Sequence, residues 1–265
     1  MVRTLRSRGS RTVLAVVAAL MLAAVGHADR AVKKYEQHSM DRERPPQASA
    51  KPVTMEPPSD AIVLFDGEDL SKWTSTEGEE APFIVKNGYM EVDPDEGSIK
   101  TKKKFGDCQL HVEWASPKPA HGEGQHRGNS GVFLGIPGKT ACYYEVQILD
   151  NYKNETYADG MAGAIYGQYP PLKDVCRPPG KWQSYDIIYR RPRFDDDGNV
   201  EKPATLTVFH NGVLVQDNEA LIGPTAHEDR PSYTPHGKLP IMLQDHGHPV
   251  KFRNVWVRPL DESKR

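Results

Sequence analysis

The sequence is poor in cysteine, in long apolar runs and in excess charge of either sign. Three of its 265 residues are Cys, and 34 basic residues nearly balance 36 acidic ones, for a formal net charge of −2. A chain without a basic excess lacks the electrostatic attraction that dominates nucleic-acid binding. No apolar run reaches the roughly 20 residues that a membrane-spanning helix needs. The composition therefore excludes a multi-span membrane protein and argues against nucleic acid as a partner.

The three cysteines are Cys108, Cys142 and Cys176. An odd number permits at most one disulfide and leaves at least one free thiol. Cys108 and Cys142 fall in predicted strands, where a buried Cys behaves as a small apolar residue. We favour the absence of a disulfide, and no neighbouring base marks any of the three as a catalytic nucleophile.

Sustained helical periodicity is also missing, whereas turn-forming residues are abundant. Gly and Pro contribute 22 residues each, and apolar residues alternate with polar ones in short segments from Ile62 to Val257. Asn87-Gly88 and Asn211-Gly212 each separate two such segments, which is a strong β-hairpin signal. The pattern predicts about ten strands in an all-β protein, an antiparallel β-sandwich or jelly roll.

The amino terminus has the features of a secretory signal peptide. Four Arg and no acidic residue precede Asp29, and the apolar run from Val13 to Val25 ends at small residues, Gly26 and Ala28. We expect residues 1–28 to be removed after Ala28, so that the protein is exported to a periplasm or the cell exterior and has no integral membrane segment. An uncleaved anchor is the alternative. Cleavage would leave 30 basic against 36 acidic residues, an acidic mature chain.

Residues 29–60 are rich in charge and proline and contain almost no apolar run. Pro45-Pro46 and Pro57-Pro58 prevent a continuous helix. We interpret this segment as a flexible tether, with a short helix over residues 30–42 as the alternative. One β domain, residues 61–262, is expected to follow it.

The stretch from Tyr143 to Asn151 is the most informative part of the sequence. Because side chains alternate along a strand, Glu145 and Gln147 share one face with Tyr143, and an apolar row occupies the other. A carboxylate in a polar row suits a sheet that lines a binding groove. Asp150 could join that face through a bulge. The alternative is an exposed outer strand, which would alternate in the same way.

Three other segments carry candidate binding residues. Arg127, Asn129 and Ser130 lie in a Gly-rich loop, where their polar groups could bind sugar hydroxyls or cap local backbone. Tyr166 lies in a Tyr- and Gly-rich loop, where its ring could stack on a sugar or pack within the loop. Gln244 and His246 follow an apolar strand; His246 could act as a base, form part of a metal site with His248, or belong to a solvated loop.

Together these segments resemble the 3-keto-disaccharide hydrolase family, long known as a domain of unknown function. The motifs that carry the resemblance lie between Ile62 and Leu260, and none lies in the tether. They are Leu64-Phe65-Asp66-Gly67 with Leu70 and Trp73, Arg127-Gly128-Asn129-Ser130-Gly131, Tyr144 to Asp150, Gly163-Ala164-Ile165-Tyr166, Trp182-Gln183, His210-Asn211-Gly212, and Phe252-Arg253-Asn254-Val255. The resemblance implies a concanavalin-A-like lectin/glucanase jelly roll that acts on 3-keto-glycosides.

The chemistry of such a substrate explains the residue types. A ketone at C3 acidifies the C2 proton, so a base can remove it, the C1 substituent can leave, and water can then add. That route needs a base and a group that stabilises the enolate oxygen. We assign the base to Glu145 or His246. Gln147, like Asn129 and Gln244, would hold hydroxyls or the enolate oxygen.

Arg127, Ser130 and Asp150 complete the predicted substrate contacts, and Tyr166 would stack on a sugar ring. The spacing Glu145-x-Gln147-x-x-Asp150 matches the Glu-x-Asp-x-x-Glu motif of glucanases, but Gln replaces its middle acid. We therefore favour an enzyme acting on an oligosaccharide or glycoside over a standard glucanase. The competing class is a non-catalytic carbohydrate-binding module. No cofactor is predicted, and a divalent metal stays open.

Overall fold

The computed structural model describes residues 37–136, 142–227 and 232–262. Its contacts divide the chain into two units, residues 1–37 and 38–265, and nearly all of the described residues belong to the second. The predicted signal peptide lies outside the described residues and remains a prediction. Among the helices in the described ranges, none is both long enough and apolar enough to cross a bilayer.

Two antiparallel sheets form the second unit, and the expected all-β antiparallel sandwich is confirmed. In spatial order the larger sheet contains β13 (Val213–Ala220), β12 (Thr205–His210), β9 (Gln183–Arg190), β6 (Cys108–Ala115), β15 (Lys251–Pro259), β4 (Tyr89–Glu91) and β3 (Ile84–Lys86), while β1 (Ile62–Phe65) also pairs with β15.

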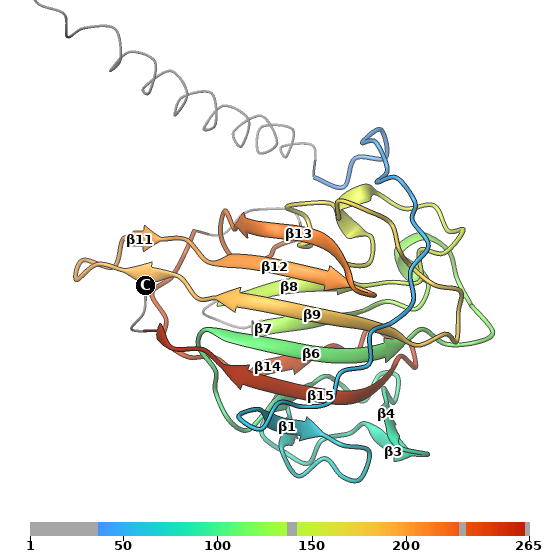
Figure 1. Ribbon diagram of the computed structural model, residues 1–265, viewed down its shortest axis with the longest axis horizontal. Helices are drawn as coiled ribbons and strands as arrows, with labels where there is room; N and C mark the ends of the chain where they lie inside the picture. The colour runs from blue at the N-terminus through green and yellow to red at the C-terminus, as the bar shows by residue number, and fades with distance from the viewer. Residues whose placement is uncertain (1–36, 137–141, 228–231, 263–265) are drawn as a thin grey trace, which may run out of the picture. The chain divides into compact units, whose positions relative to one another are not determined.

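The smaller sheet has five strands. Its order is β2 (Trp73–Ser75), β5 (Ile99–Thr101), β14 (Ile241–Leu243), β7 (Ser130–Ile136) and β8 (Cys142–Ile148), and a separate ribbon joins β10 (Arg193–Phe194) to β11 (Val200–Lys202). Figure 1 shows β12, β9, β6 and β15 in front of β8, β7 and β14. The apolar rows of both sheets form one core, with Trp114 and Phe252 among its largest fully buried side chains.

Hairpins form where the sequence predicted them. Asn87 and Gly88 join β3 to β4 with φ of 52° and 76°, and Asn211 and Gly212 join β12 to β13 with φ of 52° and 77°. Asn and Gly tolerate this left-handed backbone better than other residues, which is why the dipeptide favours a two-residue hairpin.

The segment that precedes β1 differs from the expected flexible tether. The Val53 amide donates to Ser184 Oγ at 3.0 Å, and the Met55 carbonyl accepts from Asn254 Nδ2 at 3.0 Å and Trp256 Nε1 at 3.3 Å. Figure 1 shows this segment, in blue, crossing the outer face of the larger sheet. Pro prevents a helix here but permits an extended strap, whose backbone pairs with polar side chains of the sheet. We call residues 38–60 the strap.

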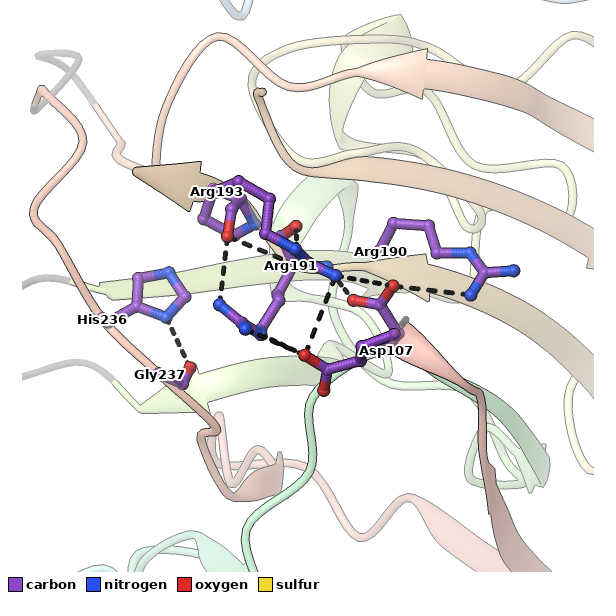
Figure 2. Close-up of polar contacts among 8 residues, drawn as sticks. Asp107, Arg190, Arg191, Arg193, His236 and Gly237 are labelled. Carbon is purple, nitrogen blue, oxygen red and sulfur yellow. Dashed lines mark hydrogen bonds and ion pairs between the residues drawn. The ribbon is translucent and has the colours of Figure 1, made fainter. Parts of the chain in front are cut away.

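The buried carboxylate of Asp107, just before β6, holds the segment that follows β9. Asp107 accepts hydrogen bonds from Arg193 Nη2 at 3.0 Å, from Arg190 Nη1 at 3.4 Å and from the Arg191 amide at 3.0 Å (Figure 2). Arg191 in turn donates to Glu262. Each of the three arginines thus has a carboxylate partner, Asp107 or Glu262, and these ion pairs hold residue 262 near the end of β9; we read this cluster as structural.

Candidate active site

Strand β8 presents its two faces as the sequence predicted. Tyr144, Val146 and Ile148 lie in the core, whereas Glu145 and Gln147 lie on the opposite face of the smaller sheet. That face borders a cavity of about 220 Å³. The cavity is lined by Asn129, Phe133, Tyr143, Glu145, Gln147, Tyr166, Thr225, His227, Gln244 and His246. Six of the nine residues predicted to form the site therefore line one cavity.

Glu145 is the one carboxylic acid among the described residues that line this cavity. Its side chain is buried, with 6% of the residue exposed, and no described Lys, Arg or His pairs with it. Burial without a compensating cation disfavours the anion, and it raises the pKa of Glu145 to about 8. In most molecules, therefore, the Glu145 carboxyl group is protonated and neutral at pH 7.

The side-chain amide of Gln147 can respond to the charge on Glu145. With Nε2 toward Gln125, it donates to Gln125 Oε1 at 3.0 Å, and its own oxygen can accept the proton of a neutral Glu145. With the amide turned, its nitrogen donates to Glu145 Oε1 at 2.8 Å and to the Ser130 carbonyl at 3.0 Å. One orientation thus suits the acid and the other suits the carboxylate.

Strand β7 leaves room for the Glu145 carboxyl group. Gly131 lies opposite Gln147 in the β7–β8 pairing. A Cβ at this position would lie 2.7 Å from Glu145 Oε1 and 2.5 Å from the Phe133 ring, closer than real Cβ contacts. The absence of a side chain at Gly131 therefore lets the carboxyl group lie flat against β7.

The loop segments that sequence analysis singled out lie along the edges of these strands. The Tyr166 amide donates to the Glu145 carbonyl at 3.2 Å, so the Gly163–Tyr166 motif continues the edge of β8. Ser130 Oγ donates to the Gln244 carbonyl at 2.6 Å and holds that residue beside β7. Ser130 itself does not line the cavity, so its contact with Gln244 is a supporting one.

Gln244 and Asn129 supply neutral polar groups to the cavity. Gln244 Oε1 is buried and has no hydrogen-bond partner within the described part of the chain. Asn129 Nδ2 donates to the Gln125 carbonyl at 2.8 Å, which fixes the side chain at the cavity wall. A buried acceptor without a partner is costly unless a ligand or water supplies a donor, so Gln244 Oε1 is suited to a substrate hydroxyl.

His246 lines the cavity from the loop after β14. Burial lowers its pKa below the ordinary 6.5 of an imidazole, despite a backbone hydrogen bond that acts in the opposite direction. The ring is therefore neutral at pH 7 and has a free lone pair to accept a proton. The His246 and His248 rings lie nearly parallel, with centroids 6.2 Å apart, and both His248 nitrogens contact backbone carbonyls.

No group of three or more His, Cys, Asp or Glu side chains within the described residues is arranged to hold a metal ion. Cys108 and Cys176 are free thiols whose pKa burial raises to about 12, so neither is activated as a nucleophile. The side chain of Cys142 lies outside the described part of the structure.

Sequence reasoning missed the second histidine of the cavity. The Tyr166 hydroxyl lies 3.1 Å from His227 Nδ1 and 2.7 Å from the Tyr157 hydroxyl. Burial, and then the contact with Tyr157, raises the pKa of Tyr166 above its usual range, so its hydroxyl stays protonated. His227 lies in the loop after β13, seven residues beyond the end of that strand, so neither periodicity nor a recognised motif indicated it.

Arg127 and Asp150 do not line the cavity, in contrast to the prediction. Arg127 Nε and Nη2 donate to the two Asp150 oxygens at 2.8 and 3.0 Å, and Nη2 also reaches the Tyr152 carbonyl. Asp150 is 1% exposed. A bidentate pair of this kind satisfies both charges and fixes the loop that follows β8. These residues therefore stabilise the structure next to the cavity and do not line it.

A family model described as "3-keto-alpha-glucoside-1,2-lyase-like domain" matches residues 60–258 of this chain. A 3-keto-disaccharide hydrolase from Bacteroides thetaiotaomicron is 22% identical over 245 residues, which cover 76% of this chain and 78% of the relative.

Crystal structures from Parabacteroides distasonis are also similar to this chain. One "putative glycosyl hydrolase" is 44% identical, covers 83% of this chain and 94% of its own, and superposes with a TM-score of 0.73. A second protein with the same description is 20% identical, covers 76% of this chain and 94% of its own, and superposes with a TM-score of 0.56, which supports the fold alone.

Proposed function

We propose that this chain, which belongs to the 3-keto-alpha-glucoside-1,2-lyase-like domain family, cleaves 3-keto-glycosides by acid–base chemistry at the Glu145 cavity. The observation that carries the proposal is the buried carboxyl group of Glu145, which has no cationic partner among the described residues and shares its cavity with a neutral imidazole. Two titratable groups whose pKa values are shifted in opposite directions form an acid–base pair at neutral pH.

In this assignment His246 is the base and Glu145 is the acid. A carboxyl group with a raised pKa can donate its proton at pH 7, and a neutral imidazole can accept one. The sequence alone did not distinguish which of these two residues is the base, and the opposite pKa shifts favour His246.

The elimination half of the proposed reaction begins at C2 of the sugar. His246 removes the C2 proton, the electrons form the C1–C2 double bond, and the C1–O bond breaks. Glu145 gives its proton to the departing oxygen and becomes a carboxylate. The products are an unsaturated 3-keto sugar and the free alcohol.

The hydration half reverses the two roles. The Glu145 carboxylate takes a proton from water, whose oxygen bonds to C1, and the protonated His246 returns a proton to C2. Glu145 and His246 end as they began, and the net reaction is hydrolysis. The turned amide of Gln147 would stabilise the carboxylate between the two halves.

Neutral polar groups would bind the rest of the sugar. Gln244 Oε1 would accept a hydrogen bond from a hydroxyl, and the Tyr166 hydroxyl, kept protonated by its surroundings, would face the developing enolate oxygen. A two-carboxylate glucanase mechanism has less support, because it needs a pair of acids across the bond. Asp150, the second acid of the motif, is paired with Arg127 and lies outside the cavity wall.

A turnover assay in D₂O tests this function. The protein is incubated with a 3-keto-glucoside and, in parallel, with the same unoxidised glucoside, and the products are followed by mass spectrometry at early times. We expect the 3-keto-glucoside to be consumed and the keto sugar product to carry one deuterium at C2. The unoxidised control should not be cleaved. Cleavage without deuterium would contradict elimination. Retention of sugar on an affinity column without turnover would favour a binding module.

We also propose that the enzyme acts outside the cytoplasm, on the basis of the signal-peptide pattern over residues 1–28. Amino-terminal sequencing of protein secreted by its host is expected to begin at Asp29. A mature chain that still begins at Met1 would refute export through this signal.

A further inference from the structure

The strap reaches the candidate cavity at its amino-terminal end. The His38 ring packs against three other rings, with centroids 4.2 Å from Tyr157, 5.0 Å from Tyr166 and 5.0 Å from His227. Tyr166 and His227 both line the cavity. A residue from a segment that sequence analysis assigned to a tether thus lies directly behind two residues of the site.

A buried carboxylate holds His38 in this position. The His38 amide donates to Asp159 Oδ2 at 3.1 Å, and His38 Nδ1 lies 3.5 Å from Asp159 Oδ1. Asp159 is fully buried, and Arg42 Nη1 lies 3.7 Å from its Oδ2. Burial by itself would raise the pKa of Asp159, but the hydrogen bonds and charges of His38 and Arg42 hold it below the usual range.

The backbone of His38 supports a specific role for its side chain. Its φ is 62°, a left-handed conformation that is uncommon outside Gly, although His, Asn and Asp adopt it more often than other residues. Such conformations persist where surrounding contacts determine them, and they occur often at functional sites. Here the contacts with Asp159 and with the three rings determine it.

The contacts of His38 continue into the cavity through hydrogen bonds. His38 Nε2 lies 2.9 Å from the His227 carbonyl and donates to it. His227 Nδ1 meets the Tyr166 hydroxyl, which also meets the Tyr157 hydroxyl. His38 therefore fixes both members of the Tyr166–His227 pair, one by ring packing and the other through its backbone.

We propose that His38 is a positioning residue of the active site, and that it orients the Tyr166–His227 pair toward the keto oxygen of the substrate. This inference rests on the proposed function, because the pair has a catalytic role only if the cavity turns over a 3-keto sugar. His38, at the amino-terminal end of the strap, then supports the site directly.

Two replacements of similar size separate positioning from mere packing. In the full chain, His38→Gln keeps an Nε2 donor for the His227 carbonyl, whereas His38→Leu fills the space without one. We expect His38→Leu to lower kcat at least tenfold, and His38→Gln to remain within about threefold of the wild type. Met40→Ala, at an exposed position of the same segment, is the matched control.

A Tyr166→Phe background tests the route of the effect. If His38 acts through Tyr166, adding His38→Leu to Tyr166→Phe lowers kcat by much less than tenfold, because the interaction is already lost. A wild-type kcat for His38→Leu, measured beside a Glu145→Gln variant that shows its expected loss of turnover, would overturn the inference.

A measurement without substrate keeps this inference separate from the proposed function. In histidine-labelled protein, the NMR titration and tautomer of the His227 ring report its contact with the Tyr166 hydroxyl. We expect His38→Leu to change both and His38→Gln to preserve them. If the wild-type protein turns over no 3-keto sugar, the proposed function fails; if the His227 ring is unaffected by His38→Leu, the positioning role fails.

Discussion

At the scale of single residues, the surroundings of Glu145 matter more than its place in a motif. A carboxyl group in the same sequence pattern would be an ordinary anion on an exposed strand. Burial without a cation, beside the neutral amide of Gln147, raises its pKa to about 8 and makes it a proton donor at pH 7.

The pH dependence of turnover follows from the two opposite shifts. His246 must be neutral to accept a proton, so kcat/KM falls as the pH drops through its lowered pKa, below 6.5. Glu145 must be protonated to donate, so kcat/KM also falls as the pH rises through about 8. We expect a bell-shaped profile whose basic limb disappears in Glu145→Gln. A profile that instead rises through pH 8 would make Glu145 the base.

Replacing either titratable residue is expected to lower turnover of a 3-keto-glucoside at least a hundredfold, because acid–base groups contribute about 10²–10⁴ in rate. Glu145→Gln removes the proton donor, and His246→Ala removes the acceptor. A nitrophenyl aglycone, which leaves without protonation, should recover much of the Glu145→Gln loss but none of the His246→Ala loss. Wild-type rates in both variants would refute the site assignment; Glu79→Gln, at an exposed position, is the control.

Gly131 is expected to tolerate no larger residue. In Gly131→Ala the new Cβ would displace the Glu145 carboxyl group and the Phe133 ring, which lie 2.7 and 2.5 Å from its position. We expect turnover to fall at least tenfold and the free energy of unfolding to drop by about 1–3 kcal/mol, the usual cost of overpacking. Gly237→Ala, where a Cβ meets nothing within 4 Å, should leave both unchanged. Urea unfolding and the turnover assay measure the two effects.

At the scale of elements, the outer face of the larger sheet is unusual because charged side chains are buried on it. His111 Nδ1 lies 2.8 Å from Asp186 Oδ1, and Glu113 accepts from Arg253 Nε at 2.7 Å and from Asn254 Nδ2 at 2.9 Å. Alternation along β6 would predict an exposed polar row, but the strap covers this face. The carboxylates of Asp186 and Glu113 therefore pair with His111 and Arg253 on this face of the sheet.

This network predicts a pH dependence of stability. Burial would lower the pKa of His111, but the hydrogen bond to Asp186 and the nearby carboxylate of Glu113 raise it above 6.5. Its contribution is therefore complete below about pH 6.5 and is lost as the pH rises through the raised value. The pKa of Glu113, held at about 2 by His111, Asn254 and Arg253 despite burial, adds stability above its ordinary 4.5 that is lost as the pH falls toward 2.

Urea unfolding of His111→Gln at several pH values tests the first part of this reasoning. The difference in free energy of unfolding from the wild type should be largest between pH 5 and 6 and should shrink steadily up to pH 9. A difference that grows with pH would contradict the sign. His121→Gln, at an exposed position, should show no trend.

The arginine cluster behind β9 predicts a larger loss of stability. Asp107→Asn would leave Arg190 and Arg193 with less compensating charge in a half-buried setting. Breaking a buried pair costs about 3–5 kcal/mol, and partial exposure of the arginines reduces this to roughly 2–4 kcal/mol. Thermal and urea unfolding should show it, whereas the exposed Asp217→Asn should change little. An Asp107→Asn protein as stable as the wild type would contradict the structural reading.

At the scale of the whole molecule, the β domain and the strap behave as one folded unit. The strap hydrogen-bonds to Ser184, Asn254 and Trp256, and its first residue packs behind the cavity. Stability and function are therefore expected to depend together on a segment without regular secondary structure.

A chain that begins at residue 61 tests that dependence. It loses four hydrogen bonds to the larger sheet, three of them shielded and worth about 1 kcal/mol each, and exposes the buried charges of β6. We expect the free energy of unfolding to fall by at least about 3 kcal/mol relative to a chain that begins at Asp29. Equal stability of the two chains would support the original interpretation of residues 29–60 as a tether.

The sequence by itself determined the fold class, the hairpins and the working face of β8. Period-two alternation and Asn-Gly turns are local signals, because side-chain direction and left-handed backbone depend on a few adjacent residues. For the same reason, the faces of Glu145 and Gln147 could be predicted without knowledge of what covers them.

Only the tertiary structure decided which polar residues meet. Arg127 and Asp150 looked like ligand-binding groups, but they satisfy each other, since a charged pair forms wherever the fold brings its members within reach. His227 and His38 entered the site from loops far apart in sequence, and the extended strap covered a face that alternation alone would leave to solvent. Burial and pairing are properties of the whole packing, and they set the pKa values on which the proposed chemistry depends.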